Sequence, residues 1–275
     1  MKKVSHSVLI EDDYPGCTIG AIVLPYGTIQ IDAPPSPEDV RMYRASLMGL
    51  KTGAERILIN LDSHLDRVLG AKLMDCPIIM HEKTAELIKA RPGNVKLQGE
   101  DTGSDWESVN GIGNVRWAPP EITFTRDMNI HWSDTPVRIT HHPGCNPGAA
   151  WVEVPSEKVL FIGDTIVKNQ PAFYGNANLH EWIVSVEYLA DHFPGYHILS
   201  GRGGEIKPDD IRKQSETLRA ALKILGPVLG EDLSAEKIDA LADSIFALET
   251  YPNKYQTKYL QRVRYGVKQY MSTAG

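Results

Sequence analysis

The sequence predicts an α/β protein built as a sandwich of sheets and helices, with an added helical segment at the C-terminus. Up to about residue 206, short runs of β-branched residues alternate with amphipathic segments of helical period, which is typical of an α/β architecture. Beyond residue 207 the segments are all helical in period. A chain of 275 residues, 42% of them hydrophobic and 23% charged, is also long enough to bury a sizeable core.

The first half of the chain opens on a hairpin. Residues 18–32 contain two β-branched runs divided by a Pro-Tyr-Gly turn, and Asp32 closes the second strand. A strand, helix and strand in succession follow, which favours a sandwich. The elements predicted here are helices over 37–50, 65–74 and 84–90, and strands over 56–60 and 77–80.

The second half begins with an irregular excursion. Residues 91–114 are rich in Gly, Asn, Asp and Ser, which argues against regular structure. The elements predicted after it are strands over 122–130, 136–140, 151–154, 159–162 and 196–199, and a helix over 179–192.

The C-terminal segment contains three predicted helices, over 209–225, 234–248 and 254–271. We therefore expect one domain over residues 1–206 and a helical extension over 207–275 that packs on it. The extension would serve either as a lid or as a surface for homo-oligomer formation.

Composition excludes several classes of partner. The net charge of −6 has the wrong sign for a protein that grips a phosphate backbone, so nucleic acid is not expected. No segment is long and apolar enough to span a membrane. Three cysteines, far apart and odd in number, do not form a secreted disulfide framework, which favours a reducing cytoplasm.

The stretch Leu-Asp-Ser-His-Leu-Asp-Arg at residues 61–67 follows a predicted buried strand and opens a helix. Its position and spacing resemble the His-x-His-x-Asp-His motif of the metallo-β-lactamase superfamily. Further landmarks fall in the family's order: the hairpin that ends in Asp32, Pro-Gly-Cys-Asn-Pro-Gly at 143–148, Gly-Asp at 163–164 and Ser-Gly-Arg-Gly at 200–203. The resemblance covers roughly residues 8–206 and implies an αββα sandwich of metallo-β-lactamase type.

The resemblance also implies where metal ligands would lie. In the family, the first two motif histidines and a later histidine hold one metal; here these positions are Asp62, His64 and Cys145. An aspartate that bridges both metals is retained as Asp164. Carboxylate, imidazole and thiolate are all ligands of zinc or ferrous iron, so one divalent metal is expected at most.

The second metal site of the family has lost its histidine ligands in this sequence. The motif aspartate is retained as Asp66, but the two histidines of this site are Arg67 and Arg202. A guanidinium has no lone pair for a metal, so the second ion should be absent. The two arginines are expected instead to neutralise Asp66 and Asp164.

Three functions are compatible with these residues. The first is a metal-dependent hydrolase of a small molecule, in which Asp66 orients or deprotonates water and Arg67 or Arg202 holds an anionic group. The second is a binding or scaffold protein without metal, in which the former active site is an Arg–Asp network. The third is thiol or redox chemistry at Cys145, whose pKa two nearby arginines would depress.

Overall fold

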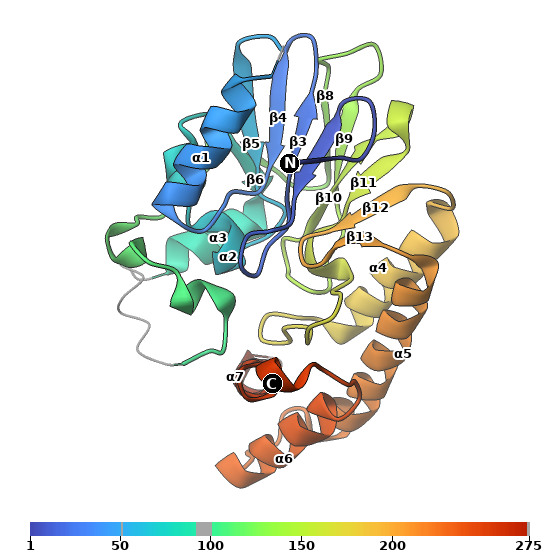
Figure 1. Cartoon of the computed structure of the whole chain (residues 1–275). Helices are drawn as coiled ribbons and strands as arrows, with labels where there is room; N and C mark the ends of the chain where they lie inside the picture. Colours follow the sequence, from blue (N-terminus) through green and yellow to red (C-terminus); the bar gives the residue numbers. More distant parts are fainter. Residues whose placement is uncertain (51, 92–100, 274–275) are drawn as a thin grey trace.

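The structure, a computed structural model, describes residues 1–50, 52–91 and 101–273 and is an αββα sandwich (Figure 1). The first sheet runs in the order β1-β2-β3-β4-β5-β6-β7, antiparallel up to β4 and parallel from β4 to β7. Its strands are β1 (Lys2–Lys3), β2 (Val8–Glu11), β3 (Ile19–Val23), β4 (Gly27–Ile31), β5 (Glu55–Ile59), β6 (Ile78–His81) and β7 (Ile122–Phe124).

The second sheet runs in the order β13-β12-β11-β10-β9-β8. Its neighbours are antiparallel except for the parallel pair β11 and β12. The strands are β8 (Asp127–Ile130), β9 (Val137–His141), β10 (Ala150–Val154), β11 (Val159–Phe161), β12 (His197–Ser200) and β13 (Gly204–Ile206).

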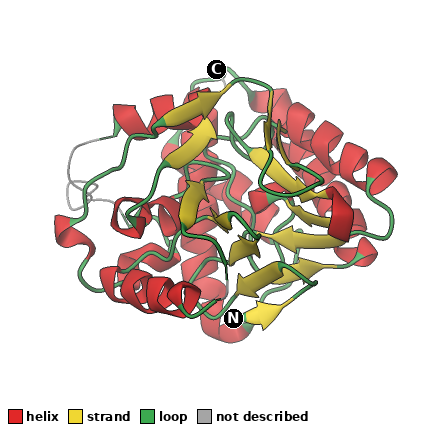
Figure 2. Cartoon of the chain, turned by 90° about the horizontal axis from the view of Figure 1, so that it is seen from above, coloured by secondary structure: helices red, strands yellow, loops and turns green. Residues whose placement is uncertain are grey.

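Helices cover the outer face of each sheet, as Figure 2 shows from above. Those of the sandwich are α1 (Pro37–Met48), α2 (Leu65–Val68), α3 (Glu82–Ala90) and α4 (Leu179–His192), and those of the tail are α5 (Pro208–Leu225), α6 (Ala235–Phe246) and α7 (Gln256–Thr273). Short 3-10 helices include η1 (Ala71–Met74), η3 (Asp105–Ser108), η4 (Ile112–Asn114), η5 (Pro155–Glu157), η6 (Gly163–Thr165), η7 (Gly226–Val228) and η8 (Asn253–Tyr255). Among the described residues, no helix combines the length and the apolar character that crossing a membrane requires.

Side chains alternate between the two faces of a strand, so each sheet can pack on the other sheet with one face and on helices with the other. In β5, Ile59 packs between the sheets while Leu58 faces α1 and its neighbours. In β10, Val152 packs between the sheets while Trp151 faces α4. Central strands such as β4 and β11 are therefore buried on both faces, and every residue of these two strands is buried.

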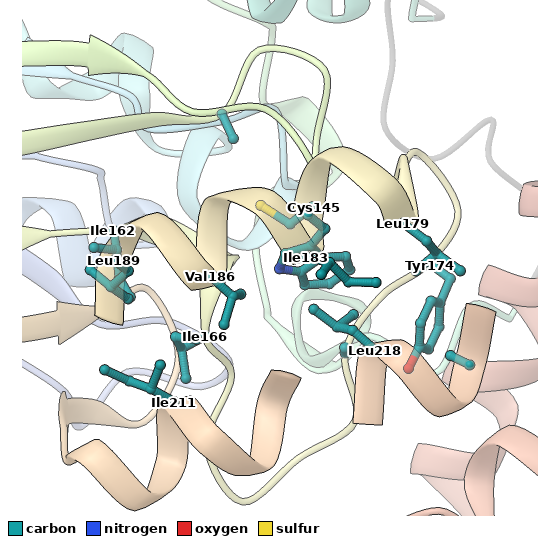
Figure 3. Packing of buried hydrophobic residues seen from close by; sticks show 14 of the residues in the cluster. Cys145, Ile162, Ile166, Tyr174, Leu179, Ile183, Val186, Leu189, Ile211 and Leu218 are labelled. Atoms are coloured by element: carbon teal, nitrogen blue, oxygen red, sulfur yellow. The ribbon is translucent and has the colours of Figure 1, made fainter. Parts of the chain in front are cut away.

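The C-terminal helices pack on the sandwich. Leu218 of α5, Ile245 of α6 and Val267 of α7 belong to the same buried apolar cluster as Trp182 of α4 (Figure 3 shows part of it). The tail thus continues the core outside the second sheet, and α7, red in Figure 1, lies across the lower edge of the sandwich. The division into residues 1–206 and 207–275 stays a prediction.

Most predicted elements are present, with three differences. The strand predicted over 122–130 is two strands, because β7 pairs with β6 in the first sheet and β8 pairs with β9 in the second. The helix predicted over 65–74 is split into α2 and η1 at Gly70, where a Cβ atom would lie 2.1 Å from the Pro34 carbonyl oxygen. The excursion predicted over 91–114 contains η3 and η4, and its residues 92–100 lie outside the described residues.

Candidate functional site

Six charged side chains meet at the edge of the sandwich where several strands end, and we call them the Asp–Arg network. The parallel strands β4 and β5 direct their carboxyl ends to this edge, which is where sites form in α/β sheets. Asp32 follows β4, Asp62 lies between β5 and α2, Asp66 and Arg67 lie in α2, Asp164 lies in η6 after β11, and Arg202 lies between β12 and β13. All six are buried, and because four carboxylates face two guanidinium groups, each cation is shared among several anions.

Arg67 is the centre of the network. Its side chain is 0% exposed and donates through Nη2 to Asp62 and through Nη1 to Asp164 Oδ1 at 2.7 Å. Its Nε lies 3.3 Å from Asp32 Oδ2. One cation is therefore shared among three carboxylates. Gly201 leaves the space for this arrangement, since a Cβ atom there would lie 2.9 Å from Nη1 of Arg67.

Arg202 completes the network from the second sheet. Its Nε donates to Asp164 Oδ2 at 2.9 Å, its Nη2 to Asp66 Oδ2 at 2.6 Å, and its Nη1 to the Gly16 carbonyl oxygen at 2.8 Å. The other oxygen of Asp66 accepts from the backbone N–H of Trp106 at 2.9 Å. Both oxygens of Asp66 and both oxygens of Asp164 are thus occupied.

The surroundings divide the aspartates electrostatically. Burial alone would raise the pKa of Asp62, but Arg67 and His64 outweigh it and hold this pKa below its usual range. For Asp164 burial is likewise outweighed, here by Arg202 and then Arg67, and its pKa is also lowered. At Asp32 burial prevails over Arg67 and raises the pKa to about 7. Asp62 and Asp164 are therefore the firmly ionised members.

His64 borders the network. Its Nδ1 lies 3.0 Å from Asp62 Oδ1, 3.4 Å from Asp164 Oδ2 and 3.1 Å from Arg67 Nη2. Its other ring nitrogen, Nε2, is buried and has no hydrogen-bond partner in the part of the chain that the structure describes. The imidazole is therefore held by one nitrogen only.

A pocket of about 310 Å³ lies beside the network. His64, Asp66 and Arg202 reach it from the network. The excursion after α3 contributes Trp106, and α7 contributes Tyr265, among other residues. The helical tail therefore forms part of the pocket wall.

The pocket contains residues that the sequence analysis missed: Arg91, Trp106, Arg262 and Tyr265. None of them lies in a motif. Arg262 and Tyr265 lie in α7, far in sequence from Arg91 and Trp106. An ion pair of Arg262 with Asp105 at 2.9 Å joins α7 to η3, and no sequence pattern indicates it.

Comparison with known proteins identifies the family of this chain. The sequence profile described as the metallo-beta-lactamase superfamily matches residues 63–227. This chain belongs to the metallo-β-lactamase superfamily. Among curated proteins, no sequence matches it significantly.

Solved structures of metallo-β-lactamase folds resemble the chain. A metallo-β-lactamase from Pontibacter korlensis superposes with a TM-score of 0.64 at 16% identity, covering 79% of this chain and 97% of its own. The DIM-1 metallo-β-lactamase gives 0.63 at 15% identity, covering 80% and 96%. A variant of the sec-alkyl sulfatase PisA1 gives 0.61 at 12% identity, covering 97% of this chain and 49% of its own. At these identities the likeness establishes the fold alone.

Members of the superfamily usually bind divalent metals, and three potential ligand residues of this site have a spacing that suits one ion. One donor atom each from Asp62, His64 and Asp164 lies within 4.8 Å of the other two. Arg67 nevertheless occupies the same space, because it donates to both carboxylates and its Nη2 lies 3.1 Å from His64 Nδ1. An ion at roughly 2.0–2.2 Å from these donors would lie against a guanidinium. With Arg67 in place, the residues do not fit a metal.

Cys145 does not join this group among the described residues. It is 2% exposed and packs beside α4 in the apolar cluster of Ile183 and Val186 (Figure 3). Burial, reinforced by Asp62 and Asp164, raises the pKa of the thiol well above its ordinary value. The expected depression of this pKa is wrong, because desolvation exceeds the effect of Arg67, and the hypothesis of thiol chemistry loses its support.

Proposed function

We propose that this member of the superfamily works without a metal ion and binds a small molecule in the pocket beside the Asp–Arg network. The observation that carries the proposal is at Asp164, the position that bridges two metals in the family. One of its oxygens accepts from Arg67 and the other from Arg202. Two guanidinium groups thus supply the positive charge that the ions would supply, and supply it permanently.

The pocket supports binding rather than a purely structural role. Its volume of about 310 Å³ lies at the lower end of the range for small-molecule sites. Aromatic side chains such as Trp106 and Phe173 share its wall with polar ones such as Asn176 and Gln269. Such a combination of apolar surface with a few polar groups is typical of ligand pockets.

A second candidate is a hydrolase that uses one ion. The spacing of Asp62, His64 and Asp164 favours it, and so do the named activities of the structural neighbours, which are metallo-β-lactamases and an alkyl sulfatase. In this candidate Arg67 would have to leave its position between the two carboxylates. The first proposal requires no such movement.

Metal content distinguishes the two candidates. The full chain, purified without chelator and then dialysed against zinc or ferrous iron under reducing conditions, is analysed for bound metal, and its thermal unfolding is followed with and without zinc. We expect substoichiometric metal and no zinc-dependent shift of Tm. One stoichiometric ion that is lost on His64→Gln would overturn the proposal and establish the second candidate.

A further inference from the structure

The pocket wall contains three arginines, and in two of them every guanidinium nitrogen donates a hydrogen bond to the protein. Arg202 is bound to two carboxylates and a carbonyl oxygen, as described above. Arg262 donates to the Gly103 carbonyl oxygen at 3.1 Å, to Gln170 Oε1 at 2.7 Å and to Asp105 Oδ2 at 2.9 Å. Both guanidinium groups are therefore held in place by three protein acceptors each.

Arg91 differs from both. Its Nη2 donates to the Ser63 carbonyl oxygen, and its guanidinium lies 5.1 Å from the centre of the Trp117 ring. Its Nη1 is buried and has no hydrogen-bond partner, and no carboxylate forms an ion pair with it within the described part of the chain. Burial lowers the pKa of Arg91 to about 10, so the group is still a cation at neutral pH.

A buried guanidinium nitrogen without a hydrogen-bond acceptor is unfavourable unless a ligand supplies one. We infer that Arg91 is the anion-binding group of the pocket and that the ligand is a small molecule with a single carboxylate and an apolar body. This inference rests on the proposed function, since it names the class of molecule that the pocket binds. It also moves the anion-binding role from Arg67 and Arg202, whose donors are occupied, to Arg91.

The charge of the ligand follows from the balance of the wall. Asp66 is engaged by Arg202, whereas among carboxylates Arg91 feels only the attraction of Asp62 and keeps one nitrogen without an acceptor among the described residues. A monoanion neutralises one cation. A phosphate dianion would leave an excess negative charge close to Asp62 and Asp66, which disfavours it.

The body of the ligand follows from the rest of the wall. Leu65, Leu87 and Phe173 offer apolar surface, and Trp106 contributes an aromatic ring. His64 Nε2, which is without a partner, is available to hydrogen-bond a polar substituent. A benzoate-sized molecule therefore satisfies the charge of Arg91 and fits the pocket volume of about 310 Å³.

The inference is tested by titrating the full chain with benzoate and with its neutral isostere benzamide. Binding is measured by calorimetry and by tryptophan fluorescence. We expect benzoate to bind roughly tenfold more tightly or better, because a hydrogen bond between charged groups is stronger than a neutral one. Arg91→Gln should abolish this preference, and Arg91→Lys should retain part of it. Arg116→Gln, which removes an exposed arginine just after the excursion, should change nothing.

Thermal unfolding and circular dichroism establish that each variant is folded, and the lysine variant keeps the test valid if Arg91→Gln is not. Equal binding of benzoate and benzamide, absence of benzoate binding at millimolar concentration, or unchanged preference in a folded Arg91→Gln variant overturns the inference. Tighter binding of inorganic phosphate than of benzoate overturns the carboxylate class. Metal content is measured separately, so an ion in the chain refutes the proposed function without deciding the role of Arg91.

Discussion

Replacement of Arg67 by methionine should remove a large part of the free energy of unfolding of this protein. The methionine keeps much of the side-chain volume but removes the cation that faces Asp62, Asp164 and Asp32. Removal of one partner of a fully buried ion pair costs about 3–5 kcal/mol, because the remaining carboxylates are left uncompensated. Against a typical stability of about 5–15 kcal/mol, this is about a fifth of the total or more.

Urea unfolding followed by circular dichroism measures this cost. The exposed Arg116 provides the matched control, since Arg116→Met should change the free energy of unfolding by less than about 0.5 kcal/mol. The double variant Arg67→Met with Asp62→Asn should lose less than the sum of the single losses, with a coupling of about 0.5–3 kcal/mol. A loss below about 1 kcal/mol for Arg67→Met, the value of an exposed ion pair, would refute the assignment of a buried network.

Three further changes test other parts of the structure. Histidine at both positions 67 and 202 replaces two fixed cations by neutral nitrogen donors beside Asp66 and Asp164, so we expect this double variant to bind zinc in excess of the natural protein in metal analysis. Because burial raises the pKa of Asp32 to about 7, its contribution to stability is full below the unfolded pKa of about 3.9 and is lost as the pH rises through 7. Asp32→Asn should therefore remove part of any decline in urea stability between about pH 4 and pH 7. Deletion of the chain after Lys207 removes α5, α6 and α7 and uncovers the apolar cluster around Trp182, so light scattering should detect aggregation.

Each of these expectations has a clear opposite result. Unchanged metal content in the double histidine variant would show that the arginines do not substitute for ions. A stability decline of the same size in Asp32→Asn as in the natural protein would remove Asp32 as its cause. A deleted chain that stays monomeric with the natural Tm would show that the tail contributes nothing to the core.

The sequence by itself determined the fold class and the place of the site. The alternation of strands and helices, and the spacing of Asp62, His64, Asp66 and Arg67, depend on local periodicity and on short-range order along the chain. These features survive in the structure because each parallel strand delivers the loop after it to the same edge of the sheet. The chemistry of Arg67 and Arg202 alone also predicted that the second metal site is not retained, since a guanidinium has no lone pair to donate.

Only the tertiary structure decided which charges meet and which side chains are desolvated. Arg67 contacts Asp164 from 97 residues away, and Arg202 contacts Asp66 from 136 residues away, so no local pattern specifies these pairs. Burial of Cys145 beside α4 reversed the expected direction of its pKa shift. The approach of α7 to the excursion formed the pocket, because ion pairs and apolar packing between distant segments depend on the complete fold.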